Sequence, residues 1–225
     1  MTADGTGRLE AFSDGVFAIE MTLLVLDMKV PHDVTSGRTL AQALVGQWPT
    51  YLAFVTSYAT ILIMWVNHHR LFTHIGRWDE RLLFANGLLL LGVVLVPFPT
   101  ALVAEYLGSA GQTTAAVVYN GTLIVIALCF NVVWKSASRD GRLLRADHDP
   151  AAVRHITDSY RFGPLFYVIA LIVGFASVTA SLLVNCALAV YFALPSRTAA
   201  SIGHAGRADG SLPGGSHHGA ERDSG

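Results

Sequence analysis

Charged side chains are scarce in this sequence of 225 residues. Lys, Arg, Asp and Glu make up only 14% of it, against about a quarter of a typical soluble domain, which argues against an ordinary water-soluble protein. The formal net charge is −1 and no basic stripe exists outside the loops, so nucleic acid is excluded as a partner. A disulfide framework and a cysteine metal site are also excluded, because the sequence has only two cysteines and both lie in apolar runs, Cys129 and Cys186.

Hydrophobic residues are abundant instead, at 52%, and they are clustered along the chain. Windows of about 20 apolar residues recur, and a helix of that length crosses the hydrocarbon core of a bilayer. A further run without any charge, 162–195, is too long for one membrane helix and short for two. The sequence therefore predicts an all-α membrane protein, with membrane helices at about 12–30, 48–68, 82–103 and 113–135.

The positive charges predict how the chain is oriented. If the run 162–195 holds two helices, only Lys29 and Arg38 of the 15 Lys and Arg residues fall in outside loops. The positive-inside rule then predicts a multi-pass protein of the cell (plasma) membrane with both termini cytoplasmic. The two ends lack apolar periodicity, so we expect three segments: a disordered N-terminus 1–7, a membrane domain 8–196 and a disordered cytoplasmic tail 197–225.

The first predicted helix carries polar groups that lipid does not tolerate. Its sequence AFSDGVFAIEMTLLVLDMKVP places Ser13, Asp14 and Glu20 among apolar residues. An unpaired carboxylate at the bilayer centre costs at least ~2.5–3.5 kcal/mol, so both acids are expected to face protein or water. Helical periodicity leaves one face of the helix entirely apolar, with Phe12, Val16, Ile19, Leu23, Leu26 and Val30.

Partners for these polar groups stand at the same depth in the next two predicted helices. We expect a polar cluster that fixes the first helix against them, made of Arg8, Phe12, Ser13, Asp14, Trp65, Asn67, His68, His69 and Asn86. Other interpretations stay open. Ser13 and Asp14 are also typical of a helix N-cap, and the two histidines are also typical of a headgroup contact. A zinc site from His68, His69 and His74 would need further ligands at fixed spacing. Glu20 is paired, protonated or beside an aqueous path.

Several motifs of the first three predicted helices form a pattern together. The first helix supplies Arg8-x-x-x-Phe12-Ser13-Asp14-Gly15-Val16, followed by Ala18-Ile19 and Thr22-Leu23-Leu24. The pattern continues in Trp65-x-Asn67-His68-His69-x-x-Phe72, in Asn86 and in Pro97-Phe98-Pro99-Thr100. It resembles the transmembrane protein 175 family of potassium channels, in its bacterial, six-helix form. The resemblance implies six membrane helices per subunit, with 162–195 forming two helices that separate near Ser177 to Ser181. It also implies a homotetramer around a central pore lined by the first helix.

The resemblance further implies roles for residues of the first helix. Ile19, Leu23 and Leu26 would form a hydrophobic constriction, and Thr22 matches a hydroxyl implicated in selectivity among bacterial members. Asp27, repeated at the outer mouth, would attract cations. Glu20 departs from the family, which often has a small or apolar residue there. No cofactor or metal is implied beyond K⁺ in the pore, and the expected partners are K⁺, other monovalent cations, membrane lipids and identical subunits.

These observations favour a potassium-preferring cation channel without a reentrant filter loop, since no Thr-Val-Gly-Tyr-Gly sequence occurs. The chief alternative is a proton-coupled secondary transporter that uses Asp14, Glu20 and the two histidines as a relay. Transporters often have helices broken near the midplane, and the first three predicted helices lack internal Gly-Pro breaks there. A membrane enzyme using His68, His69 and Asp14 lacks a substrate site, so we expect no enzymatic activity.

Overall fold

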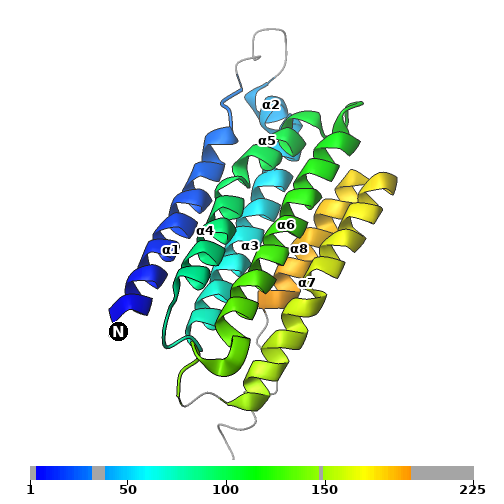
Figure 1. Ribbon diagram of the computed structural model, residues 1–225. Helices are drawn as coiled ribbons and strands as arrows, with labels where there is room; N and C mark the ends of the chain where they lie inside the picture. The colour runs from blue at the N-terminus through cyan, green and yellow to red at the C-terminus, as the bar shows by residue number, and fades with distance from the viewer. Residues whose placement is uncertain (1–3, 32–38, 147–148, 194–225) are drawn as a thin grey trace, which may run out of the picture. The chain divides into compact units, whose positions relative to one another are not determined.

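In a computed structural model, the regular elements of the described part of the chain are all helices, apart from one isolated β-bridge between Ile75 and Leu144. This part comprises residues 4–31, 39–146 and 149–193, and the predicted tail 197–225 lies outside it. The residues up to 193 form one unit, in which α1 lies at one edge of the bundle and α7 toward the other (Figure 1). The long helices are α1 (Asp4–Leu23), α3 (Trp48–Phe72), α4 (Glu80–Val94), α5 (Pro97–Tyr106), α6 (Gln112–Ser138), α7 (Pro150–Ala176) and α8 (Val178–Ala193).

Short elements complete the chain: the 3₁₀ turn η1 (Leu24–Asp27), the outer helix α2 (Leu40–Gly46) and the 3₁₀ turn η2 (Arg139–Gly141). Polar caps set where several helices begin. Asp79 accepts a hydrogen bond from the Leu82 amide at 2.9 Å at the start of α4, and Asp149 accepts one from the Ala151 amide at the start of α7. Thr39 and Gln42 form a reciprocal capping box before α2.

The predicted helix boundaries differ from the structure mainly in length. α1 begins at Asp4, so residues 4–7, inside the segment predicted as disordered, are helical. The helix predicted at 82–103 is two helices, α4 and α5. Pro97 has no amide hydrogen to continue the ladder, and the chain turns at Leu95 and Val96 before α5 begins.

The predicted break in the charge-free run is confirmed. α7 ends at Ala176 and α8 begins at Val178, because Ser177 is extended, with φ −157° and ψ 114°. The Ser177 hydroxyl accepts a hydrogen bond from the Ala180 amide at 3.2 Å, in the manner of an N-cap. The weak punctuation by Ser177 in the sequence is therefore sufficient to end one helix and start the next.

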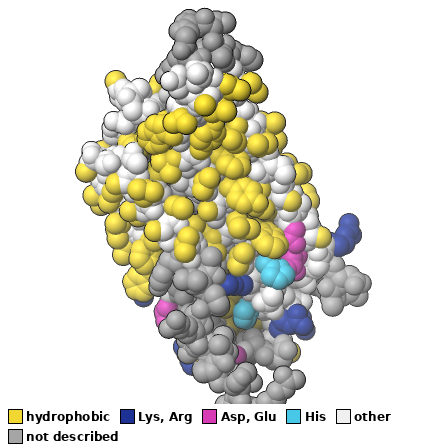
Figure 2. Space-filling model, turned by 180° about the vertical axis from the view of Figure 1, so that it is seen from behind, with side chains coloured by type: hydrophobic (Ala, Val, Ile, Leu, Met, Phe, Trp, Pro, Cys, Tyr) yellow, Lys and Arg dark blue, Asp and Glu magenta, His cyan; other side chains and the backbone are white. Residues whose placement is uncertain are grey.

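Within the described residues, four helices are long and apolar enough to cross a membrane: Trp48–Phe72, Glu80–Tyr106, Gln112–Ser138 and Ile156–Ala176. The third of the predicted spans thus comprises α4 and α5 together. α8 is apolar but shorter, and α1 carries Arg8, Glu10, Asp14 and Glu20. Figure 2 shows hydrophobic side chains over most of one face, with Lys and Arg gathered toward the end that holds the first turn of α1 in Figure 1.

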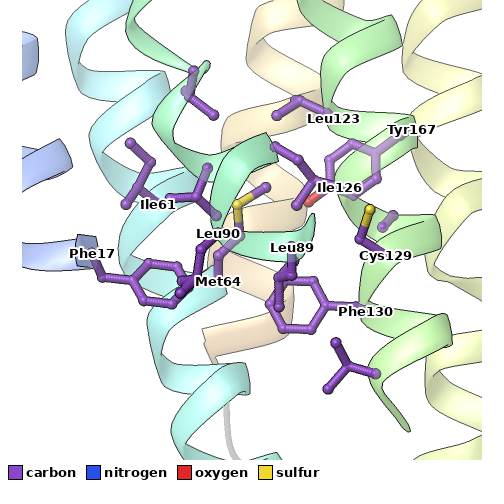
Figure 3. Packing of buried hydrophobic residues seen from close by; sticks show 14 of the residues in the cluster. Phe17, Ile61, Met64, Leu89, Leu90, Leu123, Ile126, Cys129, Phe130 and Tyr167 are labelled. Carbon is purple, nitrogen blue, oxygen red and sulfur yellow. The ribbon is translucent and has the colours of Figure 1, made fainter. Parts of the chain in front are cut away.

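The core of the bundle lies around α6, which packs against α4, α5 and α7. Its buried residues include Tyr119, Leu123 and Ile126. α1 packs against α3 and α4 at the edge of this core. Figure 3 shows the Phe17 ring reaching from α1 toward Met64 of α3 and Leu90 of α4. Because Phe17 is fully buried, its ring fixes the height of α1 on the bundle.

Candidate functional site

α1 has two faces of opposite character. The face toward the bundle is formed by residues spaced four, three and four apart: Ser13, Phe17, Glu20 and Leu24, each no more than 3% exposed. This spacing keeps the residues on one side of an α-helix. The sequence places Ser13 and Glu20 away from the apolar face, and in the structure this side of the helix packs against α3 and α4.

The opposite face of α1 is apolar and exposed. Ile19 is 58% exposed, Leu23 39% and Leu26 72%, while Phe12 lies on the same side at 64%. Val16 is half-buried and Val30 is exposed at the end of the stripe. No other described element of this chain covers Ile19, Leu23 and Leu26. The face is thus available to lipid, water or another subunit.

Three buried side chains tie α1 to α3 and α4. The Asn86 amide nitrogen donates to the Ser13 hydroxyl at 3.0 Å, and the Ser13 hydroxyl donates to the Leu9 carbonyl at 2.9 Å. His68 Nε2 lies 2.9 Å from Asn86 Oδ1. Because the Asn86 oxygen can only accept, His68 Nε2 is the donor, which fixes the ring's protonation at that nitrogen.

A second set of contacts joins α1 to α3 at Asp14 and, one helical turn nearer the N-terminus of α1, at Glu10. The Trp65 indole nitrogen donates to Asp14 Oδ1 at 2.9 Å. His69 Nδ1 lies 2.7 Å from Glu10 Oε1, and its ring stacks on that of Trp65 with centroids 6.2 Å apart. Glu10 and Asp14 are four residues apart on α1, and Trp65 and His69 are four residues apart on α3. The two antiparallel helices therefore meet at two successive turns. We call Ser13, Asp14, Trp65, His68 and Asn86 the α1 polar network.

Aromatic rings enclose the His68 imidazole. Phe72 stacks on it with centroids 4.3 Å apart, and Phe17 lies at 5.4 Å in a tilted arrangement. His68 is fully buried, and its Nδ1 has no hydrogen-bond partner among the described residues. These contacts fix the rotation of α3, because turning it would separate the His68 ring from Phe17 and break the hydrogen bond to Asn86.

Several residues of the predicted polar cluster lie outside the α1 polar network. Arg8 and Phe12 have exposed side chains, since the helical period turns both positions away from α3 and α4. Asn67 is half-buried, and its backbone carbonyl accepts a hydrogen bond from the Tyr160 hydroxyl at 3.2 Å. Glu10, which the sequence analysis did not select, pairs with His69. The sequence signal for this pairing was the spacing: Glu10 lies four residues before Asp14 and so on the same face of the helix.

The remaining predicted residues lie farther along α1. Glu20 is 3% exposed, and its Oε2 has no hydrogen-bond partner among the described residues. The exposed Thr22 hydroxyl donates to the Ile19 carbonyl at 2.7 Å. Asp27 is half-buried at the end of η1. Within the part of the chain that the structure describes, no group of three His, Cys, Asp or Glu side chains is placed to hold a metal.

Two further buried polar sets were missed by sequence reasoning. The Ser57 hydroxyl lies 2.7 Å from that of Thr100 and 3.0 Å from that of Tyr119, linking α3, α5 and α6. The Asn120 amide donates to Ser181 at 3.1 Å and accepts from Asn185 at 3.0 Å, linking α6 and α8. Single hydroxyls and amides in apolar runs give little signal, although Thr56, Ser57 and Thr60 recur on one stretch of α3.

Comparison with known proteins identifies the chain. Residues 8–97 match the family described as endosomal/lysosomal potassium channel TMEM175. A potassium channel of Chamaesiphon minutus is 52% identical over 192 residues, covering 85% of this chain and 95% of the relative. A potassium channel of Streptomyces collinus is 42% identical over 202 residues, covering 87% and 98%. The human endosomal/lysosomal proton channel TMEM175 is 33% identical over 138 residues, and only 27% of its length is covered.

Solved structures agree with the sequence comparison. The crystal structure of a lysosomal potassium-selective channel TMEM175 homolog from Chamaesiphon minutus has a TM-score of 0.77 and 50% identity, covering 84% of this chain and 97% of that one. A variant of the potassium channel MtTMEM175 shares the fold at 16% identity, with a TM-score of 0.54 over 89% of this chain and 94% of that one. The chain therefore belongs to the TMEM175 family of potassium channels and is similar to its bacterial members over most of its length.

Proposed function

We propose that this protein is a potassium-preferring channel in which the exposed apolar face of α1 lines the conduction path. One observation carries the proposal: α1 is anchored by the α1 polar network on one side and leaves Ile19, Leu23 and Leu26 uncovered on the other. Relatives that are 52% and 42% identical are named potassium channels, which favours a channel over a proton-coupled transporter.

The uncovered face gives a physical reason for assembly. A row of large apolar side chains along a membrane helix is stable against lipid or against a second copy of itself. In a homotetramer of six-helix subunits, symmetry would bring four copies of Ile19, Leu23 and Leu26 around one axis. Rings of this kind close a path to ions by excluding water from a narrow apolar constriction, without any filter loop.

Polar groups on α1 support an ion path along this axis. Thr22 is exposed next to Leu23, and because its hydroxyl hydrogen is donated to the Ile19 carbonyl, its oxygen lone pairs are left to accept. An oxygen in that position can replace part of the hydration shell of K⁺. Asp27 follows five residues later, at the end of η1, where a ring of carboxylates would concentrate cations at the outer mouth.

The α1 polar network then acts as a positioning device. Successive residues of a helix are about 100° apart, so a rotation of α1 by a fraction of a turn would move Ile19 out of the path. Bonds from Ser13 to Asn86 and from Asp14 to Trp65 resist that rotation. His68, His69 and Asp14 therefore have structural partners, and we propose no catalytic role for them.

The proposed setting is the cell membrane, with both termini cytoplasmic. Reconstituted protein tests the function through K⁺-driven flux. Liposomes loaded with K⁺ and diluted into Na⁺ medium should lose K⁺ when a protonophore balances the charge, at a rate that does not saturate with K⁺ concentration. A flux that saturates and requires a pH gradient would support the transporter instead.

A further inference from the structure

Two loops far apart in sequence are joined at the end of the bundle that holds the first turn of α1. The Gly76 and Arg77 amides donate to the Leu143 carbonyl at 2.9 and 3.1 Å, and the Arg145 amide donates to the His74 carbonyl at 3.0 Å. Ile75 and Leu144 pair as an antiparallel bridge, and both are buried. The turn between α3 and α4 and the segment after η2 are thus held as one unit.

This junction gathers arginines around an open pocket of about 570 Å³. Arg77 comes from one loop, and Arg142 and Arg145 come from the other. Thr6, in the first turn of α1, also lines the pocket. At Gly76 a Cβ atom would lie 3.2 Å from Arg145 Cα and Cγ, so the two backbones approach closely and hold Arg77 and Arg145 near each other.

A second open pocket of about 510 Å³ adjoins the first, and Arg142 lines both. Its other cations are Arg81, from the start of α4, and Lys135 and Arg139, from the end of α6 and the adjoining η2. Among the described residues that line it, one carries a carboxylate: Asp79, which already accepts a hydrogen bond from the Leu82 amide as the cap of α4. Ser136 and Ser138 add hydroxyl groups.

Topology alone does not account for this arrangement. The positive-inside rule explains why cations lie on the cytoplasmic side, but not why cations from the start of α4, the end of α6 with η2, and two loops surround two adjoining pockets. Like charges so placed repel one another, and an anion between them removes that repulsion. Arginine forks bind phosphate oxygens through paired hydrogen bonds, so phosphate is the anion that this set of donors suits best.

We propose that these adjoining pockets, the basic headgroup site, bind a phosphate-bearing anion, with Arg77 and Arg142 as principal contacts. The site lies at the cytoplasmic end of apolar helices, where headgroups of the inner leaflet are found, so an anionic phospholipid is the source that the geometry favours. Because Thr6 belongs to α1, an occupant also touches the first turn of the helix that lines the proposed pore.

Lipid binding to the purified, full-length protein tests the site, and binding does not depend on channel activity. Native mass spectrometry in detergent would count bound lipids during titration with phosphatidylglycerol and, separately, with phosphatidylcholine. The double variant Arg77→Gln/Arg142→Gln removes two pocket cations. The matched control Arg154→Gln/Arg161→Gln removes two exposed cations of α7 that line neither pocket.

Phosphatidylglycerol is expected to bind more tightly than phosphatidylcholine to the wild type and to the control. Each cation near a headgroup contributes about 1 kcal/mol, so the pocket variant, which lacks two, should bind phosphatidylglycerol roughly 30-fold more weakly. If that variant does not fold, Arg77→Lys/Arg142→Lys keeps the charge without the fork and should weaken binding several-fold. Equal losses in pocket and control variants, or no preference for the anionic lipid, would overturn the proposal.

A second arm distinguishes the source of the phosphate. Inorganic phosphate or glycerol phosphate is titrated against bound phosphatidylglycerol in the same experiment. Displacement only at tens of millimolar supports a lipid headgroup, whose acyl chains add affinity. Displacement at micromolar concentrations, again lost in the pocket variant, would assign the site to a soluble phosphate compound. Failure of the proposed channel function would leave either result unchanged, since neither measurement involves ion flux.

Discussion

Replacement of Asn86 by alanine tests how α1 is held. The Asn86 side chain is 1% exposed and bridges His68 of α3 and Ser13 of α1 through bonds of 2.9 and 3.0 Å. In Asn86→Ala, the His68 Nε2 hydrogen is left without a partner among aromatic rings, while Ser13 keeps its bond to the Leu9 carbonyl. A buried donor without an acceptor costs about 1–3 kcal/mol, and removal of the side chain adds a small cavity.

The expected loss of about 2 kcal/mol should lower the melting temperature of the purified protein by roughly 4–8 °C. The K⁺ over Na⁺ preference should fall as well, because α1 is freed to rotate. Asn131→Ala is the matched control. Its amide donates to the Ala127 and Tyr160 carbonyls, both at 2.8 Å, and so joins α6 to α7 without touching α1.

Asn131→Ala should therefore lower the melting temperature and leave the ion preference unchanged. The readouts are a thermal unfolding curve in detergent and a reversal potential from reconstituted protein for each variant. An Asn86→Ala protein that melts within about a degree of wild type would refute the reasoning, and so would equal effects of the two variants on ion preference.

Three further predictions concern α1. Leu23→Asn should wet the proposed constriction and raise single-channel conductance several-fold with weaker selectivity; unchanged currents would remove Leu23 from the path. Asp27→Asn should lower conductance at about 10 mM salt and leave it nearly unchanged at about 1 M, where screening hides the charge; a loss independent of salt would argue for a structural role. Glu20 is buried with one oxygen unpartnered, and an ionised carboxylate there would cost several kcal/mol, so Glu20→Gln should melt at or above the wild-type temperature. A marked fall in that temperature would indicate a charged Glu20 paired across a subunit boundary.

The two faces of α1 could be predicted from the sequence because one rule governs both. Residues spaced three and four apart share a face, so Ser13 and Glu20 fall on the buried side and Ile19 and Leu23 on the exposed side. Trp65, His68 and Asn86 could be matched to α1 by depth, since the C-terminal part of α3 and the N-terminal part of α4 lie at the same end of the bundle. The division of the charge-free run near Ser177 also followed from the sequence with the help of the resemblance.

Other features depend on side-chain reach and on packing between distant segments. Glu10 looks like a solvated residue before a membrane helix, and only the antiparallel contact with α3 brings it to His69. The bonds from Ser57 to Thr100 and Tyr119 join three helices whose relative rotation the sequence does not specify. The break before Pro97 was missed because the apolar pattern continues unchanged through α5.

The reversal potential of the reconstituted protein, with K⁺ on one side and Na⁺ on the other, tests the central claim most directly. We predict a clear shift toward the K⁺ equilibrium potential, which Leu23→Asn reduces while raising the current. A reversal potential near zero in equal concentrations of the two ions would contradict a potassium-preferring channel. The absence of current, together with proton-dependent and saturable solute uptake, would contradict a channel of any kind.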